Sequence, residues 1–226
     1  QLYNLDQYLM NGGNLVVFQD KVDTNLQEGR ADLIQSNIFP ILENYGIYVK
    51  NNLVQDAECS QVSVQQRQGI FVMNIPVKYP FFPISNNMNK NHPIVANLDN
   101  LVFVFVSEID AERVKQGVNF EPLIYSSKNS GQNIGRFDLS YEKYMKTDLK
   151  TLFKESPKVL AGMYSGHFES YFTDNEQAQN ENYIPSTDNA KILLVADADF
   201  IKASAGGGSP TNVNFAMNAM DYLSGN

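Results

Sequence analysis

The segment Lys191-Ile-Leu-Leu-Val-Ala-Asp-Ala-Asp-Phe200 decides the fold of this chain. Its apolar run predicts a buried strand that ends in two carboxylates, Asp197 and Asp199. A glycine-rich turn follows, and then a stretch with helical spacing from Asn212 to Leu223. This order of strand, turn and helix is typical of an α/β domain, in which ligands bind beside the carboxyl ends of the strands.

The first part of the chain alternates helix and strand signals. Apolar residues at helical spacing stop at Asn11-Gly12-Gly13, and a strand then leads to Asp20. We expect helices over residues 2–9 and 31–45, the second interrupted by Pro40, and strands over residues 14–18 and 47–49. Because the connections are short, the order favours a mainly parallel sheet with helices on both faces.

The middle of the chain predicts a mixed or antiparallel, β-rich extension of this sheet. Strands are expected over residues 59–64, 70–77, 101–107 and 120–125, a short helix over residues 92–98, and polar loops over residues 126–137 and 173–189. We interpret the chain as a single α/β domain over residues 1–226, with residues 58–172 as an alternative β-rich insertion or subdomain. Because helical spacing begins at Leu2, the first strand of the domain is expected upstream of Gln1.

The composition argues against nucleic-acid binding and against a membrane-spanning helix. The chain has 17 Lys and Arg against 25 Asp and Glu, a net charge of −8, and no basic cluster interleaved with aromatic residues. Such a chain is not expected to bind nucleic acid. Apolar runs such as residues 101–106 are much shorter than the roughly 20 residues that span a bilayer. The sequence therefore predicts no membrane-spanning helix within this chain.

Cysteine and histidine provide no recognisable catalytic or metal motif. Cys59 is the single cysteine, so an internal disulfide is excluded, and we expect an unreactive buried thiol. His92 and His167 lie outside any H-E-x-x-H pair, which argues against a zinc enzyme. His92 is expected at a turn or helix start, and His167 is a candidate site residue at a strand end. We predict no metal and no cofactor.

The carboxylates at the strand end are the main candidates for binding. Residues two apart on a strand face the same side, so Asp197 and Asp199 could together bind a cation, accept hydrogen bonds from sugar hydroxyls, or share acid–base work. The alternative is that one caps the following turn or helix while the other is solvated. Asp20 ends another predicted strand and is expected to converge on the same crevice.

The glycine-rich turn supplies two further candidates. Residues 206–212, Gly-Gly-Gly-Ser-Pro-Thr-Asn, precede a helix whose free backbone N–H groups could hold an anion near Ser209 and Asn212. The segment lacks the spacing of a nucleotide-binding loop. The alternative is a flexible surface turn with Thr211 or Asn212 as the helix N-cap.

The succession of motifs resembles the extracytoplasmic domain of the uncharacterised ABC-transporter auxiliary proteins, the group that includes the gliding-motility protein GldG. The pieces that carry the resemblance span nearly the whole chain: Leu5-Asp6-Gln7-Tyr8-Leu9-Met10-Asn11-Gly12-Gly13-Asn14-Leu15-Val16-Val17, Leu42-Glu43-Asn44-Tyr45-Gly46-Ile47-Tyr48-Val49, Leu53-Val54-Gln55-Asp56, His92-Pro93-Ile94, Val195-Ala196-Asp197-Ala198-Asp199-Phe200 and Asn218-Ala219-Met220-Asp221-Tyr222-Leu223-Ser224-Gly225.

The resemblance implies a flavodoxin-like or amidotransferase-like domain that faces the periplasm. It also implies that helices outside this fragment anchor the domain in the inner membrane, and that the domain works with an ABC permease and ATPase. Amidotransferase chemistry would not carry over, because the chain lacks a nucleophilic cysteine at a strand-to-helix elbow. The leading hypothesis is thus a non-enzymatic accessory domain that binds a ligand, such as a carbohydrate, or a partner protein.

Two other hypotheses are compatible with the sequence. One is a carbohydrate-binding or carbohydrate-active hydrolase domain, in which Asp197 or Asp199 works as a carboxylate pair with Asp20 or Glu108. The other is a docking module, which predicts an exposed apolar patch and no cleft.

Overall fold

The computed structural model describes residues 1–202 and 208–225. The helices are α1 (Leu2–Met10), α2 (Ile38–Asn44), α3 (Leu149–Leu152) and α4 (Pro210–Ser224), with 3-10 turns η1 (Glu142–Tyr144) and η2 (Glu176–Gln179). The strands are β1 (Leu15–Phe18), β2 (Val22–Asn25), β3 (Arg30–Leu33), β4 (Asn52–Asp56), β5 (Cys59–Gln68), β6 (Phe71–Ser85), β7 (Asn87–Met88), β8 (Leu101–Val102), β9 (Val118–Tyr125), β10 (Ser130–Ile134), β11 (Val159–Gly166), β12 (Phe168–Glu169), β13 (Ser186–Thr187) and β14 (Lys191–Val195). None of the described helices is both long and apolar enough to cross a membrane.

A five-stranded mixed sheet forms the centre, in the order β1-β14-β11-β9-β7. The predicted strand over residues 191–195 is its second member, and its pairing with β1 is parallel, as expected. The expectation of a mainly parallel sheet is wrong, because the pairings of β11 with β14, β11 with β9, and β7 with β9 are antiparallel. After β1 the chain forms the β2–β3 hairpin instead of crossing directly to a second parallel strand.

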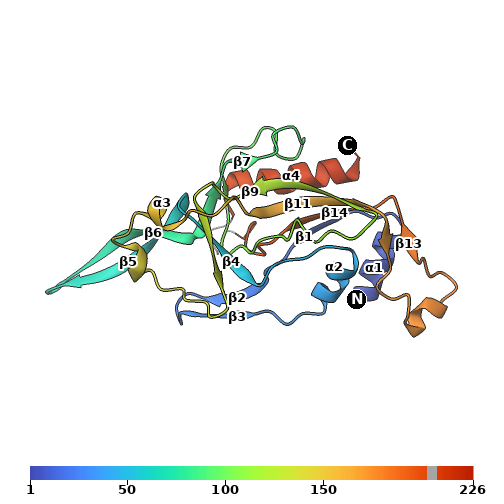
Figure 1. Cartoon of the computed structure of the whole chain (residues 1–226), viewed down its shortest axis with the longest axis horizontal. Helices are drawn as coiled ribbons and strands as arrows, with labels where there is room; N and C mark the ends of the chain where they lie inside the picture. Colours follow the sequence, from blue (N-terminus) through green and yellow to red (C-terminus); the bar gives the residue numbers. More distant parts are fainter. Residues whose placement is uncertain (203–207, 226) are drawn as a thin grey trace.

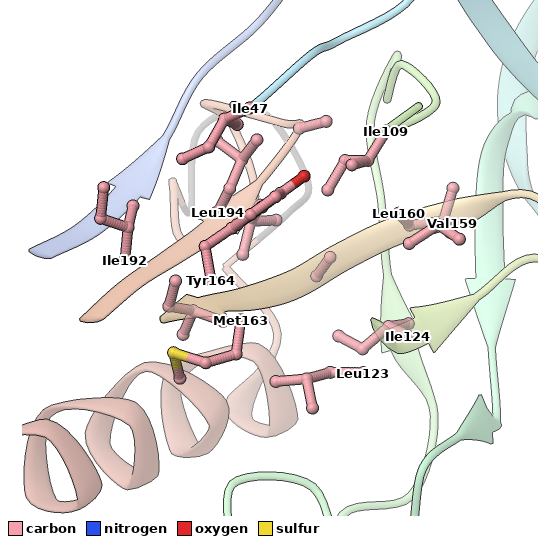
Figure 2. Packing of buried hydrophobic residues seen from close by; sticks show 14 of the residues in the cluster. Ile47, Ile109, Leu123, Ile124, Val159, Leu160, Met163, Tyr164, Ile192 and Leu194 are labelled. Carbon is pink, nitrogen blue, oxygen red and sulfur yellow. The ribbon is translucent and has the colours of Figure 1, made fainter. Parts of the chain in front are cut away.

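Helices cover both faces of this sheet, as predicted (Figure 1): α4 lies on one face, and α1 and α2 lie on the other. Successive residues of a strand point to opposite faces. Figure 2 shows Met163 on the side of α4 and Tyr164 on the side of Ile47. All three side chains are buried in one large apolar cluster that also includes Phe200 and Phe215. One continuous apolar cluster therefore packs α4 and the first two helices against opposite faces of the same sheet.

A second apolar cluster lies beside the central sheet, where β4 and β6 meet the segment that contains η1 and α3. Aromatic rings dominate it, and the ring of Tyr79 packs against Phe81, Phe82, Phe105 and Tyr144. The long β5–β6 hairpin extends outward from this region (Figure 1). Residues 58–172 thus contain the β5–β6 hairpin and also supply β7, β9 and β11 to the central sheet.

The helix predicted over residues 31–45 is shorter than expected. Residues 30–33 form β3, which pairs with β2, and the helix begins only at Ile38. Proline is tolerated in the first turn of a helix but not in its interior. Pro40 is the third residue of α2, so the start of the helix is placed just before it. The predicted strand over residues 47–49 is also wrong, since Val49 forms only an isolated bridge with Ile109.

Two predictions for the middle of the chain are wrong, and one strand is shorter than predicted. Residues 92–98 form successive turns instead of a helix, and the ammonium of Lys90 binds the carbonyls of Val95 and Leu98. The predicted exposed loop over residues 126–137 contains β10, which pairs with β4, and buries the hydroxyls of Ser126 and Ser130. The strand predicted over residues 101–107 ends at Val102.

Candidate functional site

The carboxylate of Asp197 is buried at the end of β14 with 0% of the residue exposed. Its two oxygens accept backbone N–H groups, from Val104 at 2.7 Å and from Asp199 at 2.8 Å. Burial raises the pKa of Asp197 well above its ordinary value, although the two backbone hydrogen bonds oppose this effect. Asp197 therefore fixes the turn after β14 and the segment that carries Val104.

Asp20 does converge on this strand end. One of its carboxylate oxygens accepts the N–H of Ala198 at 2.7 Å, and Asp199 pairs with Lys202 at 2.7 Å. The expectation that Asp197 and Asp199 face the same side as strand neighbours is wrong, because β14 ends at Val195. Asp197 points inward instead, while the side chain of Asp199 is partly exposed.

Burial, together with the nearby charge of Asp199, raises the pKa of Asp20 to about 6, against the lowering effect of the Ala198 hydrogen bond. The folded state thus holds this proton more tightly than the unfolded chain. As pH rises from about 4 to above 6, Asp20 in the folded state loses its proton. The buried charge then lowers the free energy of unfolding, and this cost is complete above the folded-state pKa. Asp20→Asn removes that cost and keeps an oxygen for Ala198.

We expect Asp20→Asn to raise the free energy of unfolding by about 1–2 kcal/mol at pH 8 and by nothing near pH 4, allowing for the partial exposure of Asp20. Urea unfolding at both pH values measures the difference. Asp174→Asn, at an exposed position, is the matched control and should change stability by less than about 0.5 kcal/mol at either pH. A gain that is equal at pH 4 and pH 8 would contradict the explanation.

The crevice expected at the strand ends is covered by residues 103–109. In this segment Val104 donates to Asp197, Ser107 donates to the Ala196 carbonyl at 3.0 Å, and Ile109 donates to the Val159 carbonyl at 2.9 Å. The segment thus crosses the end of β14 and the beginning of β11. Within residues 1–202 and 208–225, no group of three or more His, Cys, Asp or Glu side chains is placed to hold a metal ion.

Ser209 and Asn212 serve the local structure of α4. Ser209 is the N-cap, and its hydroxyl accepts the N–H of Asn212 at 3.1 Å, so the expectation of Thr211 or Asn212 as N-cap is wrong. The buried amide of Asn212 binds both backbone groups of Val102 and the carbonyl of Phe200. Of the predicted anion loop over residues 206–212, Gly206 and Gly207 lie outside the described residues.

The two histidines and the cysteine lie apart from the acidic strand end. His167 follows β11 at the opposite end of the sheet, where its Nδ1 lies 2.9 Å from Asp188, and 43% of its side chain is exposed. His92 is buried in a turn, where its Nδ1 accepts the N–H of Ile94, and burial lowers its pKa. Cys59 is half-buried, and burial raises the pKa of its thiol to about 11, which supports an unreactive thiol.

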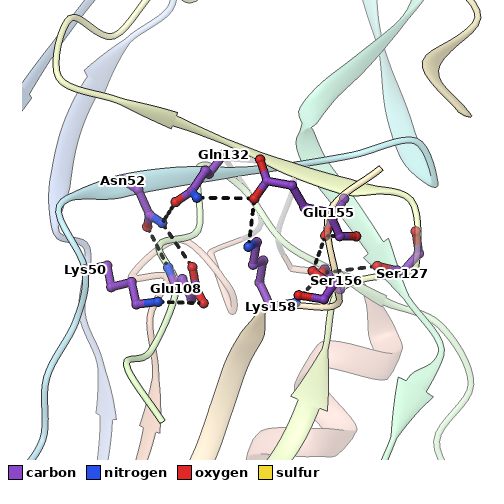
Figure 3. Close-up of polar contacts among 10 residues, drawn as sticks. Lys50, Asn52, Glu108, Ser127, Gln132, Glu155, Ser156 and Lys158 are labelled. Atoms are coloured by element: carbon purple, nitrogen blue, oxygen red, sulfur yellow. Dashed lines mark hydrogen bonds and ion pairs between the residues drawn. The ribbon is translucent and has the colours of Figure 1, made fainter. Parts of the chain in front are cut away.

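A chain of polar contacts that the sequence did not indicate lies beside the sheet (Figure 3). Glu108 accepts from Lys50 at 3.0 Å and from the side chain of Asn52 at 3.3 Å, and Asn52 also donates to Gln132 at 3.0 Å. Gln132 in turn donates to Glu155 at 3.2 Å, and Glu155 pairs with the largely buried ammonium of Lys158 at 2.8 Å. Glu108, a candidate for a hydrolase pair, is therefore held by a lysine and an amide.

This polar chain borders a cleft lined in part by β10, which we call the β10 cleft. It is lined by Gln55, Gln132, Lys143, Tyr144, Phe153 and Glu155, among others. Gln55 donates to the hydroxyl of Tyr144 at 2.5 Å, so amide and phenol groups meet at the wall. These residues come from distant parts of the chain, and no motif or spacing links them. The pairing of β10 with β4 brings Gln55 and Gln132 together, and the bridge between Ser130 and Glu155 adds the segment after α3.

The comparisons with known proteins identify the family of this chain. Residues 1–224 match the family described as an ABC-type uncharacterized transport system, and the chain belongs to this family of transport-system auxiliary proteins. An uncharacterized protein of Borreliella burgdorferi (strain ATCC 35210 / DSM 4680 / CIP 102532 / B31) is 25% identical over 224 residues, which are 97% of this chain. The chain spans 41% of the length of that relative. No solved structure matches the chain.

Proposed function

We propose that this chain is a non-enzymatic accessory domain of an ABC transport system of the export or gliding type. In this proposal it faces the periplasm, is anchored by helices outside residues 1–226, and transmits the binding of a ligand or partner to the permease and the ATPase. Membership of the auxiliary family supports the accessory role. The orientation and the gliding or export type rest on the resemblance of the sequence motifs.

The non-enzymatic part of the proposal rests on the contacts that the candidate catalytic carboxylates make within the fold. Asp197 accepts two backbone N–H groups, Asp199 pairs with Lys202, and Glu108 pairs with Lys50. A hydrolytic carboxylate pair needs both groups in a water-accessible cleft, about 5 to 10 Å apart. The burial of Asp197 and the ion pairs of its neighbours support a structural role for these carboxylates.

For the ligand we propose the β10 cleft, with a neutral, polyhydroxylated molecule such as an oligosaccharide. Gln55 and Gln132 offer amide donors and acceptors, and Tyr144 and Phe153 offer aromatic surface. Small-molecule sites combine apolar or aromatic walls with a few convergent polar groups. The lysine and glutamate side chains on the same wall are of opposite sign and do not select a strongly charged ligand.

A thermal-shift screen of the chain against neutral oligosaccharides, peptidoglycan fragments and nucleotides tests the proposal. A ligand that binds only the folded state raises the melting temperature as its concentration exceeds Kd. We expect an oligosaccharide to raise it, Gln132→Ala to remove the increase, and the matched control Asp199→Asn to retain it. Each increase is measured against the melting temperature of the same variant without ligand.

Three results would overturn parts of the proposal. An increase lost in Asp199→Asn and retained in Gln132→Ala would place the ligand at the end of β14. Release of reducing sugar from the bound oligosaccharide would show an enzyme. If no compound raises the melting temperature, the ligand-binding proposal fails and a protein-docking domain is favoured.

A further inference from the structure

The β5–β6 hairpin ends in four consecutive exposed apolar residues, Ile70-Phe71-Val72-Met73, which we call the apolar tip. Their exposed fractions are 90%, 68%, 56% and 45%. Figure 1 shows the hairpin projecting from the rest of the domain, so the tip lies far from both apolar clusters. Large apolar side chains gathered at the end of a projecting element indicate an interaction site.

The charge around the apolar tip differs from that of the whole chain. Between Cys59 and Leu98 the sequence has no Asp or Glu, while Arg67, Lys78 and Lys90 are basic. The whole chain carries a net charge of −8. An anionic lipid surface repels carboxylates, and carboxylates lose hydration water when they approach it. A segment without carboxylates avoids both of these costs. The hairpin therefore carries no carboxylate that would oppose its approach to anionic lipid.

Apolar side chains lie on both faces of the hairpin at the apolar tip, next to the polar side chains of Gln66 and Arg67 on the paired strand. Neighbouring strand residues point to opposite faces, so Phe71 and Met73 lie on one face and Val72 lies on the other. Ile70 lies in the turn beyond the last strand pair. A flat surface of a partner protein would cover one face and leave the other in water. A lipid layer surrounds the tip and buries side chains on both faces.

We propose that the apolar tip inserts into the interfacial layer of a lipid bilayer, with Arg67 at the level of the headgroups. Arg67 is exposed and lies opposite Val72 in the strand register, where its guanidinium can reach phosphate while the tip is immersed. From Ile70 to Met73 the strand extends about 10 Å, which matches the roughly 5–10 Å depth of interfacial insertion. This contact goes beyond the proposed ligand binding and does not depend on it.

Backbone pairing makes this insertion feasible. Residues 65–68 pair with residues 71–74 across the hairpin, so the backbone of the immersed segment is largely hydrogen-bonded within the hairpin. Unpaired backbone groups would otherwise oppose entry into an apolar layer. Gly69 closes the hairpin with a positive φ of 66°, a backbone conformation that glycine adopts at little cost.

Flotation of the 226-residue chain with vesicles tests the proposal. Vesicles of phosphatidylcholine alone and of phosphatidylcholine with a quarter phosphatidylglycerol are compared at low salt. We expect binding to both and tighter binding to the anionic vesicles, because apolar burial and electrostatic attraction add. The double variant Ile70→Ser/Phe71→Ser should lower the partition coefficient about tenfold or more, since two large apolar side chains no longer enter the lipid. Arg67→Gln should weaken binding to the anionic vesicles more than binding to phosphatidylcholine alone, because only the anionic vesicles carry a net negative charge.

The matched control is Met217→Ser/Met220→Ser, which removes two exposed apolar side chains from α4. It should bind vesicles as the unmodified chain does. All variants should retain the circular-dichroism spectrum of the unmodified chain, because the changed side chains are exposed. A chain that binds neither vesicle, or an Ile70→Ser/Phe71→Ser variant that binds as tightly as the unmodified chain, would overturn the proposal and favour a protein groove as the partner.

A fluorescent probe gives a second, independent measurement. In a Cys59→Ser background, an environment-sensitive dye is attached at Ile70→Cys or, as the control, at Met217→Cys. Vesicles should shift the emission of the dye at position 70 to shorter wavelength and leave the dye at position 217 unchanged. Equal behaviour of the two dyes would contradict insertion through the apolar tip.

Discussion

Replacement of Asp6 by Ala should lower the free energy of unfolding by about 3–5 kcal/mol, because it leaves several buried donors without a partner. Asp6 lies on α1 with none of its surface exposed. One carboxylate oxygen accepts the hydroxyl of Tyr45 at 2.8 Å and the N–H of Tyr171 at 2.9 Å, and the other accepts the hydroxyl of Ser170 at 2.7 Å. The side chain therefore joins α1 to the end of α2 and to the loop after β12.

The expected magnitude follows from the donors that the substitution leaves unpaired. A buried donor without a partner costs about 1–3 kcal/mol, and the donors that share this carboxylate, which also include the side-chain amide of Gln7 at 2.9 Å, do not add fully. Tyr45→Phe removes one of these donors together with its need for a partner, and should cost about 1 kcal/mol. Asp174→Ala is the control for loss of an exposed carboxylate and should change stability by less than about 0.5 kcal/mol.

Urea unfolding followed by circular dichroism measures all three variants. The order expected for the loss of stability is Asp6→Ala, then Tyr45→Phe, then Asp174→Ala. If Asp6→Ala costs no more than Tyr45→Phe, the carboxylate does not hold the three segments together, and the apolar contacts of α1 must do so.

The elements that could be predicted from the sequence are those with a strong local pattern. The strand before Asp197 has an unbroken apolar run, and α4 has helical spacing after a turn, so each shows its structure within about ten residues. Residues 31–45 also have helical spacing, but their first part pairs with β2. Pairing between strands is a tertiary effect that overrides local spacing, and for this reason the spacing predicts a longer helix than the one that forms.

In the candidate site too, features set by the local sequence could be predicted, and features set by contacts between distant segments could not. A carboxylate at a strand end is visible in the sequence, and the meeting of Asp20 with the turn after β14 follows from the parallel pairing of two strands. The distant partner of Asp197 is the backbone N–H of Val104, 93 residues away, and no residue type marks it in advance. The β10 cleft could not be predicted, because its polar side chains come from separate segments of the chain.

Replacement of Asn212 by Ala should lower the free energy of unfolding by about 3–4 kcal/mol, because buried backbone groups lose this partner. The Asn212 amide accepts the N–H of Val102 at 3.0 Å and donates to its carbonyl at 2.7 Å, as a residue of a neighbouring strand would. It also donates to the carbonyl of Phe200 at 2.6 Å. Each of these groups costs about 1–3 kcal/mol when it loses its partner, and the costs do not add fully.

Two further variants separate this structural role from a role in binding. Asn212→Asp keeps an acceptor for Val102 but places a carboxylate oxygen against two carbonyls, so it should cost at least as much as Asn212→Ala. Asn214→Ala changes an exposed asparagine of the same helix and should stabilise by a few tenths of a kcal/mol, because Ala is the better helix former. Thermal and urea unfolding measure the series. If Asn212 contributed to ligand binding and not to the fold, Asn212→Ala and Asn214→Ala would have similar free energies of unfolding. The buried position of Asn212 against β8 would then have to be explained by ligand contact alone.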